Sequence, residues 1–130
     1  MRNDKENLII ALSFQFALKI IELSEKLEEG RKFVISRQIL KSGTSIGANV
    51  REAQNAESRA DFIHKLKIAA KEADETGYWL LLCEESDNYP NTEELRVDLS
   101  SIIKVLSKII GSSSRNGVKS SNQIISKSSN

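Results

Sequence analysis

The chain has 130 residues, which is enough for one hydrophobic core and too few for two ordinary domains. Proline occurs once and aromatic residues make up 5% of the chain, so the composition excludes a typical sheet protein and favours packed amphipathic helices. The 19 basic and 18 acidic residues nearly cancel, so the chain lacks the strong positive charge of a dedicated nucleic-acid binder, and only a local basic patch is compatible with such a role.

The sequence also bears on the cellular compartment. The single cysteine, Cys83, cannot form a disulfide within the chain. No cleavable signal peptide and no long uncharged apolar run is recognisable. We therefore expect a reduced, cytoplasmic location and no membrane partner.

The first predicted helix spans residues 4–28 and carries two apolar stripes at helical spacing. One stripe consists of Ile9, Leu12, Phe16, Ile20, Leu23 and Leu27, and the other of Ile10, Phe14, Ala17 and Ile21. Together they are wider than one antiparallel neighbour would cover, which indicates a subunit interface. Gly30 follows the helix and is suited to the left-handed conformation common just past a helix end.

The second predicted helix spans residues 33–56 and contains small residues where a bulky face would be expected. Each interior glycine costs about 1 kcal/mol relative to alanine, so close contact with another helix has to offset that cost. The third predicted helix has small residues at the same spacing, which predicts close packing of helices two and three through Gly43, Gly47, Ala70, Ala73 and Gly77. A phosphate loop is not indicated, because the order Lys41-Ser42-Gly43-Thr44 differs from a Walker motif and no strand precedes it.

The third and fourth predicted helices span residues 59–86 and 92–110. Ser58 starts a capping box, Pro90 interrupts the chain between the two helices, and Asn91 caps the fourth. Gly111 is expected to end the fourth helix. The serine-rich, acid-free residues 112–130 are predicted to form a disordered basic tail, leaving residues 1–111 as one all-α, antiparallel up-down four-helix bundle.

Few residues suggest chemistry. His64 is the only histidine, so a di-iron bundle site cannot be completed, and no metal site or cofactor is predicted. Cys83 is interpreted as a packing residue. A buried polar network between helices is predicted for Ser45, Asn49, Glu52 and Glu75, which share or face one contact surface. Solvated positions and a ligand site remain as alternatives for these residues.

Several separated motifs carry a family resemblance. The stretch Ser45-Ile46-Gly47-Ala48-Asn49-Val50-Arg51-Glu52-Ala53 resembles the S-I-x-x-N-I-x-E-G type motif of the four-helix-bundle proteins encoded in intervening sequences of bacterial 23S rRNA genes. Arg37-Gln38-Ile39 before it, and residues 61–69 and 75–80 after it, resemble the family's second and third helices. Ala53 departs from the motif, because many members have glycine there.

The resemblance implies an up-down bundle that assembles into a ring-like homopentamer without known catalytic activity. Binding of structured RNA has been proposed for this family. The fold is also similar to that of the accessory protein of diversity-generating retroelements, which binds nucleic acid together with a reverse transcriptase. The usual picture there is a strongly basic surface, from which this near-neutral chain departs.

The sequence thus supports the hypothesis of a non-enzymatic oligomeric bundle that associates electrostatically with structured RNA or a ribonucleoprotein. The candidate nucleic-acid contacts are Arg31, Lys32, Arg37 and Lys41. The alternative is a protein-interaction scaffold that does not bind nucleic acid. No small-molecule substrate is indicated.

Overall fold

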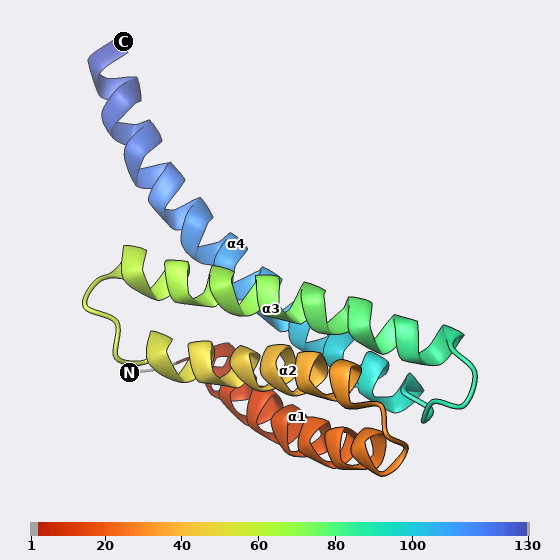
Figure 1. Cartoon of the computed structure of the whole chain (residues 1–130). Coiled ribbons are helices and arrows are strands. Elements are labelled where there is room, and N and C mark those ends of the chain that lie inside the picture. Colours follow the sequence, from red (N-terminus) through yellow and green to blue (C-terminus); the bar gives the residue numbers. More distant parts are fainter. Residues whose placement is uncertain (1–2, 130) are drawn as a thin grey trace.

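The computed structural model describes residues 3–129, and the surroundings of side chains up to Ser113. The four helices are α1 (Asp4–Glu29), α2 (Phe33–Ala53), α3 (Arg59–Glu85) and α4 (Glu93–Ser129). The described residues contain no strand, which confirms the predicted all-α class. Each helix folds back beside the preceding one, and α4 also lies against α1 (Figure 1). Contacts therefore run in a closed cycle around one core.

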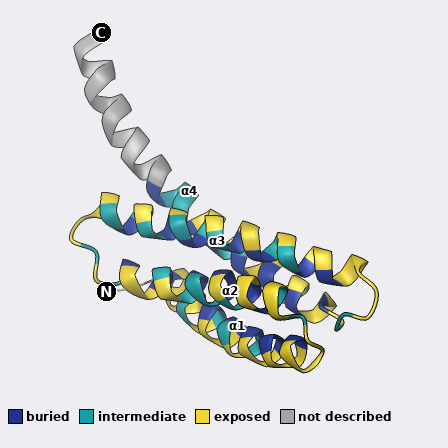
Figure 2. Cartoon of the chain, in the orientation of Figure 1, coloured by how far each residue is buried: buried dark blue, intermediate teal, exposed yellow. Residues whose placement is uncertain are grey.

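The core is made by the stripes of apolar residues at helical spacing. In α1 the predicted first stripe points inward, with Phe16, Ile20 and Leu27 almost completely buried and Leu12 partly buried against the core. Figure 2 shows buried positions facing the centre of the four helices and exposed positions facing outward. The hydrophobic effect on these inward stripes is the main force that holds the helices together.

A polar pair interrupts this core between α1 and α2. The hydroxyl oxygens of Ser24 and Ser36 lie 2.6 Å apart, and the Ser36 hydroxyl also donates to the Ser24 carbonyl oxygen at 3.0 Å. Both residues are buried, so each hydroxyl needs a partner that replaces water. The sequence pattern did not predict this pair.

Side-chain caps define the helix starts. The Asn3 side chain accepts from the Glu6 amide, and the Glu6 carboxylate accepts from the Asn3 amide, both at 2.9 Å, which forms a reciprocal capping box. One half of the capping box predicted at Ser58 is confirmed, because the Ser58 hydroxyl accepts from the Asp61 amide, but the Asp61 carboxylate accepts from the Glu57 amide and not from Ser58. At α4, Asn91 accepts from the Glu93 amide, while the buried Thr92 hydroxyl donates to the Leu80 carbonyl and ties α4 to the end of α3.

The connection between α1 and α2 differs from the prediction. Gly30 has φ −83°, and it is the next residue, Arg31, that has the left-handed φ of 63°. The Lys32 amide donates to the Leu27 carbonyl and the Arg31 amide to the Glu28 carbonyl, which is the hydrogen-bond pattern of a Schellman motif. The motif requires its left-handed residue one position later than Gly30, so the glycine brings no conformational advantage here.

The close glycine contact lies between α1 and α2. A Cβ added to Gly43 would come within 2.8 Å of Ile20 Cγ1 and Cγ2, and one added to Gly47 within 3.3 Å of the Ser13 carbonyl oxygen. The nearest atom to a Gly77 Cβ is Leu99 Cδ2 on α4, at 3.4 Å.

The predicted glycine contact between helices two and three is therefore wrong, although Ala73 is buried and Ala70 partly buried in α3. A stripe three and four residues apart locates a packed face, but it does not say which of two flanking helices covers that face.

Helix α4 continues past the predicted end at residue 110 and includes residues 112–129 of the predicted disordered tail. Gly111 does not adopt a positive φ, so it does not form the left-handed cap that would stop the helix. The surroundings of side chains beyond Ser113 lie outside the described part, as do those of Arg115, Lys119 and Lys127.

Helix α1 is long and apolar enough, by length and composition alone, to cross a membrane. It is the one such helix among the described residues, with a mean hydropathy of 1.5 over an 18-residue window of which 33% is buried. A core helix passes the same test, and α1 contributes Phe16 and Ile20 to the core. Its exposed apolar residues therefore require a separate explanation.

Candidate functional site

The predicted nucleic-acid contacts lie near the end of the molecule where α1 meets α2. Arg31 is exposed in the connection, and the Lys32 ammonium lies 4.9 Å from the centre of the Tyr89 ring in the α3–α4 connection. Arg37 and Lys41 are exposed one turn apart on α2. Acidic residues lie at the same end of the molecule, including Glu28 and Glu29 in the last turn of α1 and Asp87 in the α3–α4 connection. This basic group is therefore partly offset by its neighbours.

The four residues of the predicted polar network do not form a network within the described chain. The Ser45 hydroxyl donates to the Lys41 carbonyl and the Asn49 amide donates to the Ser45 carbonyl, so both side chains bond to the backbone of their own helix. Glu52 is exposed and pairs with Lys65 at 3.4 Å, and Glu75 is exposed. Hydrogen bonds from these side chains to the backbone of their own helix form in place of bonds between helices, because they need no partner helix.

The reactive residue types are not grouped. Cys83 is buried, and desolvation raises the pKa of its thiol, which disfavours the nucleophilic thiolate. His64 is exposed on α3. The described residues include no group of three or more His, Cys, Asp or Glu side chains that could hold a metal ion.

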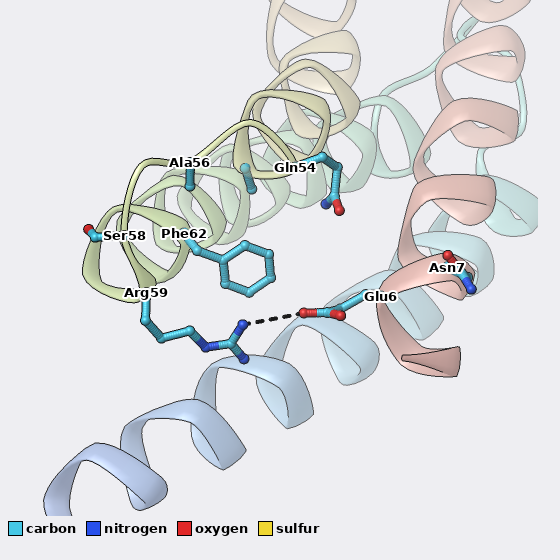
Figure 3. Close-up of a pocket in the computed structure, with 8 residues that line it drawn as sticks. Glu6, Asn7, Gln54, Ala56, Ser58, Arg59 and Phe62 are labelled. Atoms are coloured by element: carbon cyan, nitrogen blue, oxygen red, sulfur yellow. Dashed lines mark hydrogen bonds and ion pairs between the residues drawn. The ribbon is translucent and has the colours of Figure 1, made fainter. Parts of the chain in front are cut away.

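A hollow of about 670 Å³ lies between the start of α1 and the α2–α3 connection. Figure 3 shows Arg59 and Glu6 extending toward each other across it, with the Phe62 ring beside them. The Arg59 Nη1 to Glu6 Oε1 distance is 3.5 Å, and the guanidinium lies 4.4 Å from the centre of the Phe62 ring. Arg59 Nη2 also donates to the Ser113 hydroxyl. These contacts occupy the Arg59 guanidinium and link α1, α3 and α4. We therefore interpret the residues that line the hollow as a structural junction between helices.

The outer side of α1 is apolar and exposed. Phe14 is 60% exposed and is accompanied, at spacings of four and seven residues, by Leu18 and Ile21 on the same face of the helix, while Leu8 is exposed on the adjoining face. Beside this stripe, α1 and α2 enclose a hollow of about 600 Å³ whose lining includes Ile10, Phe14, Ala17, Gly47 and Val50. Contiguous exposed apolar surface of this kind marks an interaction site more often than a free surface.

Charge is divided along α3, a feature that the net charge of the chain hides. The first half of the helix, residues 59–71, has one acid, Asp61, against four bases, whereas residues 72–85 have acids and no base. The four bases are Arg59, Lys65, Lys67 and Lys71. The remainder of α4 after Asp98 contains lysines and no acid, including Lys104 and Lys108. Counting charge in blocks along the sequence would have found this division.

The described features define a four-helix, all-α protein with an apolar outer stripe and segregated surface charge. The model of the 23S rRNA-intervening sequence protein family matches residues 5–111, and the chain belongs to this family. The match extends from the first turn of α1 to Gly111 in α4, so it includes all four helices. The resemblance predicted from the motif around Asn49 is thereby confirmed.

A solved structure supports the same assignment. The chain is similar to a protein of unknown function from the S23 ribosomal protein family of Bacteroides thetaiotaomicron, with 48% sequence identity and a TM-score of 0.78. The similarity covers 82% of this chain and 98% of the other. No curated protein matches the chain significantly.

Proposed function

We propose that this chain is a non-enzymatic, cytoplasmic protein that self-associates as an up-down four-helix bundle into a ring-like homopentamer and binds structured RNA electrostatically. The exposed apolar stripe on α1 carries the self-association part of the proposal. The segregated basic residues and the membership in a family named for 23S rRNA intervening sequences support the RNA part.

The α1 stripe favours a second copy of the chain as the partner surface. Phe14, Leu18 and Ile21 lie on one face over two turns, Leu8 is exposed on the adjoining face, and no charged residue lies between Leu8 and Leu18. Burial of each such side chain is worth about 1.5–3 kcal/mol when it is complete, so a few of them suffice to offset the cost of association. Closed rings repeat one interface around an axis, which uses the same stripe in every subunit.

Light scattering on the purified chain tests self-association, with the mass of a homopentamer as the expected result. Phe14→Glu is expected to give monomers, because a carboxylate would have to be buried in the interface. Phe14→Leu is the matched control that keeps an apolar side chain and is expected to keep the assembly. A monomeric wild type at micromolar concentration, or an unchanged mass for Phe14→Glu, would contradict this part of the proposal.

Fluorescence anisotropy with a labelled structured RNA, measured over a salt series, tests RNA binding. Electrostatic binding predicts a log-log slope of about −0.9 for each phosphate contacted in a duplex. Binding that does not respond to salt would identify other forces.

Absence of binding even at low salt would favour the second candidate function, a scaffold for proteins. The exposed Tyr78 and Leu81 on α3 and Val97 on α4, outside the α1 stripe, favour that alternative.

A further inference from the structure

We infer that the nucleic-acid phosphate backbone binds over the basic halves of α3 and α4, at a surface formed by Lys67, Lys71, Lys104 and Lys108. This inference rests on the proposed RNA binding and locates it away from the predicted contacts Arg31, Lys32, Arg37 and Lys41. We call the four lysines the α3–α4 basic surface. Lysines act as point charges toward phosphate and carry no base specificity, so the ligand is the backbone itself.

Three contacts fix how α3 and α4 lie against each other. Thr92 bonds to Leu80, Leu99 Cδ2 lies 3.4 Å from the Cβ position of Gly77, and Ser113 bonds to Arg59. The helices are therefore antiparallel along their whole contact. The same register places Lys67 level with the turn that contains Lys108, and Lys71 level with the turn that contains Lys104.

All four lysines are exposed on these two neighbouring helices. Lys67 also lines a hollow of about 440 Å³ between α3 and α4, together with Arg59, Ala60, Ile63, His64 and Ser113. That lining contains no acidic residue. A phosphate that enters the hollow would therefore meet cationic and neutral groups only.

Two bases close to the first half of α4, Lys19 and Arg96, are neutralised by acids, in contrast to these lysines. Lys19 pairs with Asp98 at 2.7 Å and with Glu94 at 3.1 Å, and Arg96 pairs with Glu84. Among the described residues, none of the four lysines of the α3–α4 basic surface has an ion-pair partner within 4 Å. Their charges are free to replace the counterions of a phosphate backbone.

Helix stability does not explain the charge order in α3. The macrodipole favours acids in the first turn and bases in the last turn, by about 0.3–1 kcal/mol for each charge. The first turn of helix α3 contains the acid Asp61 beside Arg59, and its last turn contains Glu84 and Glu85 with no base. The arrangement thus opposes the local preference at the C-terminal end of the helix, which fits a surface organised for a ligand.

The decisive comparison uses two quadruple variants that remove the same total charge. One replaces Lys67, Lys71, Lys104 and Lys108 by alanine, and the other replaces Arg31, Lys32, Arg37 and Lys41 by alanine. Circular dichroism and light scattering establish that each variant keeps its helices and its mass. Affinity is then measured by anisotropy over a salt series with an RNA hairpin, a DNA hairpin of the same sequence and anionic lipid vesicles.

We expect the α3–α4 variant to lose at least about 10-fold in affinity near 50 mM salt, and its slope to fall by about 1 for each lysine that contacts phosphate. The other variant is expected to lose clearly less. Asp74→Asn combined with Glu75→Gln removes two exposed acids next to the surface and is expected to tighten binding. The two hairpins identify which nucleic acid supplies the backbone, and binding of either supports the inference.

Equal losses in the two quadruple variants would show that only net charge matters and would overturn the inference, as would a larger loss in the α1–α2 variant. Neither result would affect the proposed RNA binding. A wild type that binds neither hairpin at low salt would overturn the proposed RNA binding itself, and binding to vesicles alone would assign the surface to anionic lipid instead.

Discussion

Replacement of Gly43 by alanine tests the close contact between α1 and α2. The new Cβ would lie 2.8 Å from both Cγ1 and Cγ2 of Ile20 and 3.0 Å from its Cδ1. Cγ1 and Cγ2 are bonded directly to the Ile20 Cβ, so rotation about χ2 moves neither of them away. Ile20 is fully buried, so a rotation about χ1 would push its side chain into other core atoms.

The magnitude follows from two opposing terms. Overpacking of a filled core costs about 1–3 kcal/mol, whereas alanine improves on glycine in a helix by about 1 kcal/mol. We expect Gly43→Ala to lower the free energy of unfolding by about 1 kcal/mol. Gly77→Ala provides the contrast, because its nearest atom is the terminal Leu99 Cδ2 at 3.4 Å, so the gain of up to about 1 kcal/mol in helix propensity is retained.

The free energy of unfolding of both variants is measured by urea unfolding, followed by the fluorescence of Trp79, the single tryptophan. The protein concentration is held fixed, because self-association shifts the apparent stability. The variant Ile20→Ala removes all three contacting atoms, so combining it with Gly43→Ala is expected to cost less than the sum of the two single changes. A Gly43→Ala protein as stable as the wild type, or additive costs in the double variant, would refute the proposed packing.

Three further predictions concern single positions. Ser36→Ala leaves the buried Ser24 hydroxyl without its partner and is expected to cost about 1–3 kcal/mol, whereas Ser24→Ala is expected to cost less, because the Ser36 hydroxyl still donates to the Ser24 backbone carbonyl; the double variant is expected to cost less than the sum of the two in the same urea assay. Arg31→Gly removes a left-handed arginine and is expected to raise the melting temperature, with a gain of up to about 1 kcal/mol. Because burial raises the pKa of Cys83 above its ordinary value of 9.0, the stability due to its neutral thiol is complete below pH 9.0 and declines as pH rises further. Native Cys83 should react with a thiol reagent far more slowly than the urea-unfolded chain, and equal rates would contradict its burial.

Local signals made the helices predictable. The Ser58 hydroxyl, the single proline at position 90 and the inward stripe of α1 each act over a few residues, and each predicted feature is present in the structure. Two details failed for the same reason. Gly30 was predicted to adopt the left-handed conformation, and Gly43 was predicted to pack against the third helix. The position of a cap within its motif and the identity of a flanking helix both depend on how the whole chain packs.

The candidate surfaces were harder to predict because they involve two helices at once. Phe14 and Ile21 were recognised as a second stripe, since both lie in one helix. Lys71 and Lys104 are 33 positions apart in the sequence, and only the register of α3 against α4 brings their turns to the same level. The predicted polar network failed for a related reason. Asn49 lies in α2 and Glu75 in α3 as predicted, but the Asn49 side chain bonds to its own helix and Glu75 is exposed.

The two proposed surfaces are compatible because of their places in the fold. In the described residues the backbone of α1 packs beside α2 and α4, and α1 reaches α3 through the Glu6–Arg59 ion pair at its start, so α1 and α3 lie on opposite corners of the four-helix arrangement (Figure 1). The outer stripe of α1 and the exposed lysines of α3 therefore face away from each other. Self-association through Phe14 and its neighbours would leave Lys67 and Lys71 open to a ligand in every subunit. Linked weak sites raise the effective concentration of one another, so an assembly of near-neutral chains can hold a long phosphate backbone that a single chain would bind only weakly.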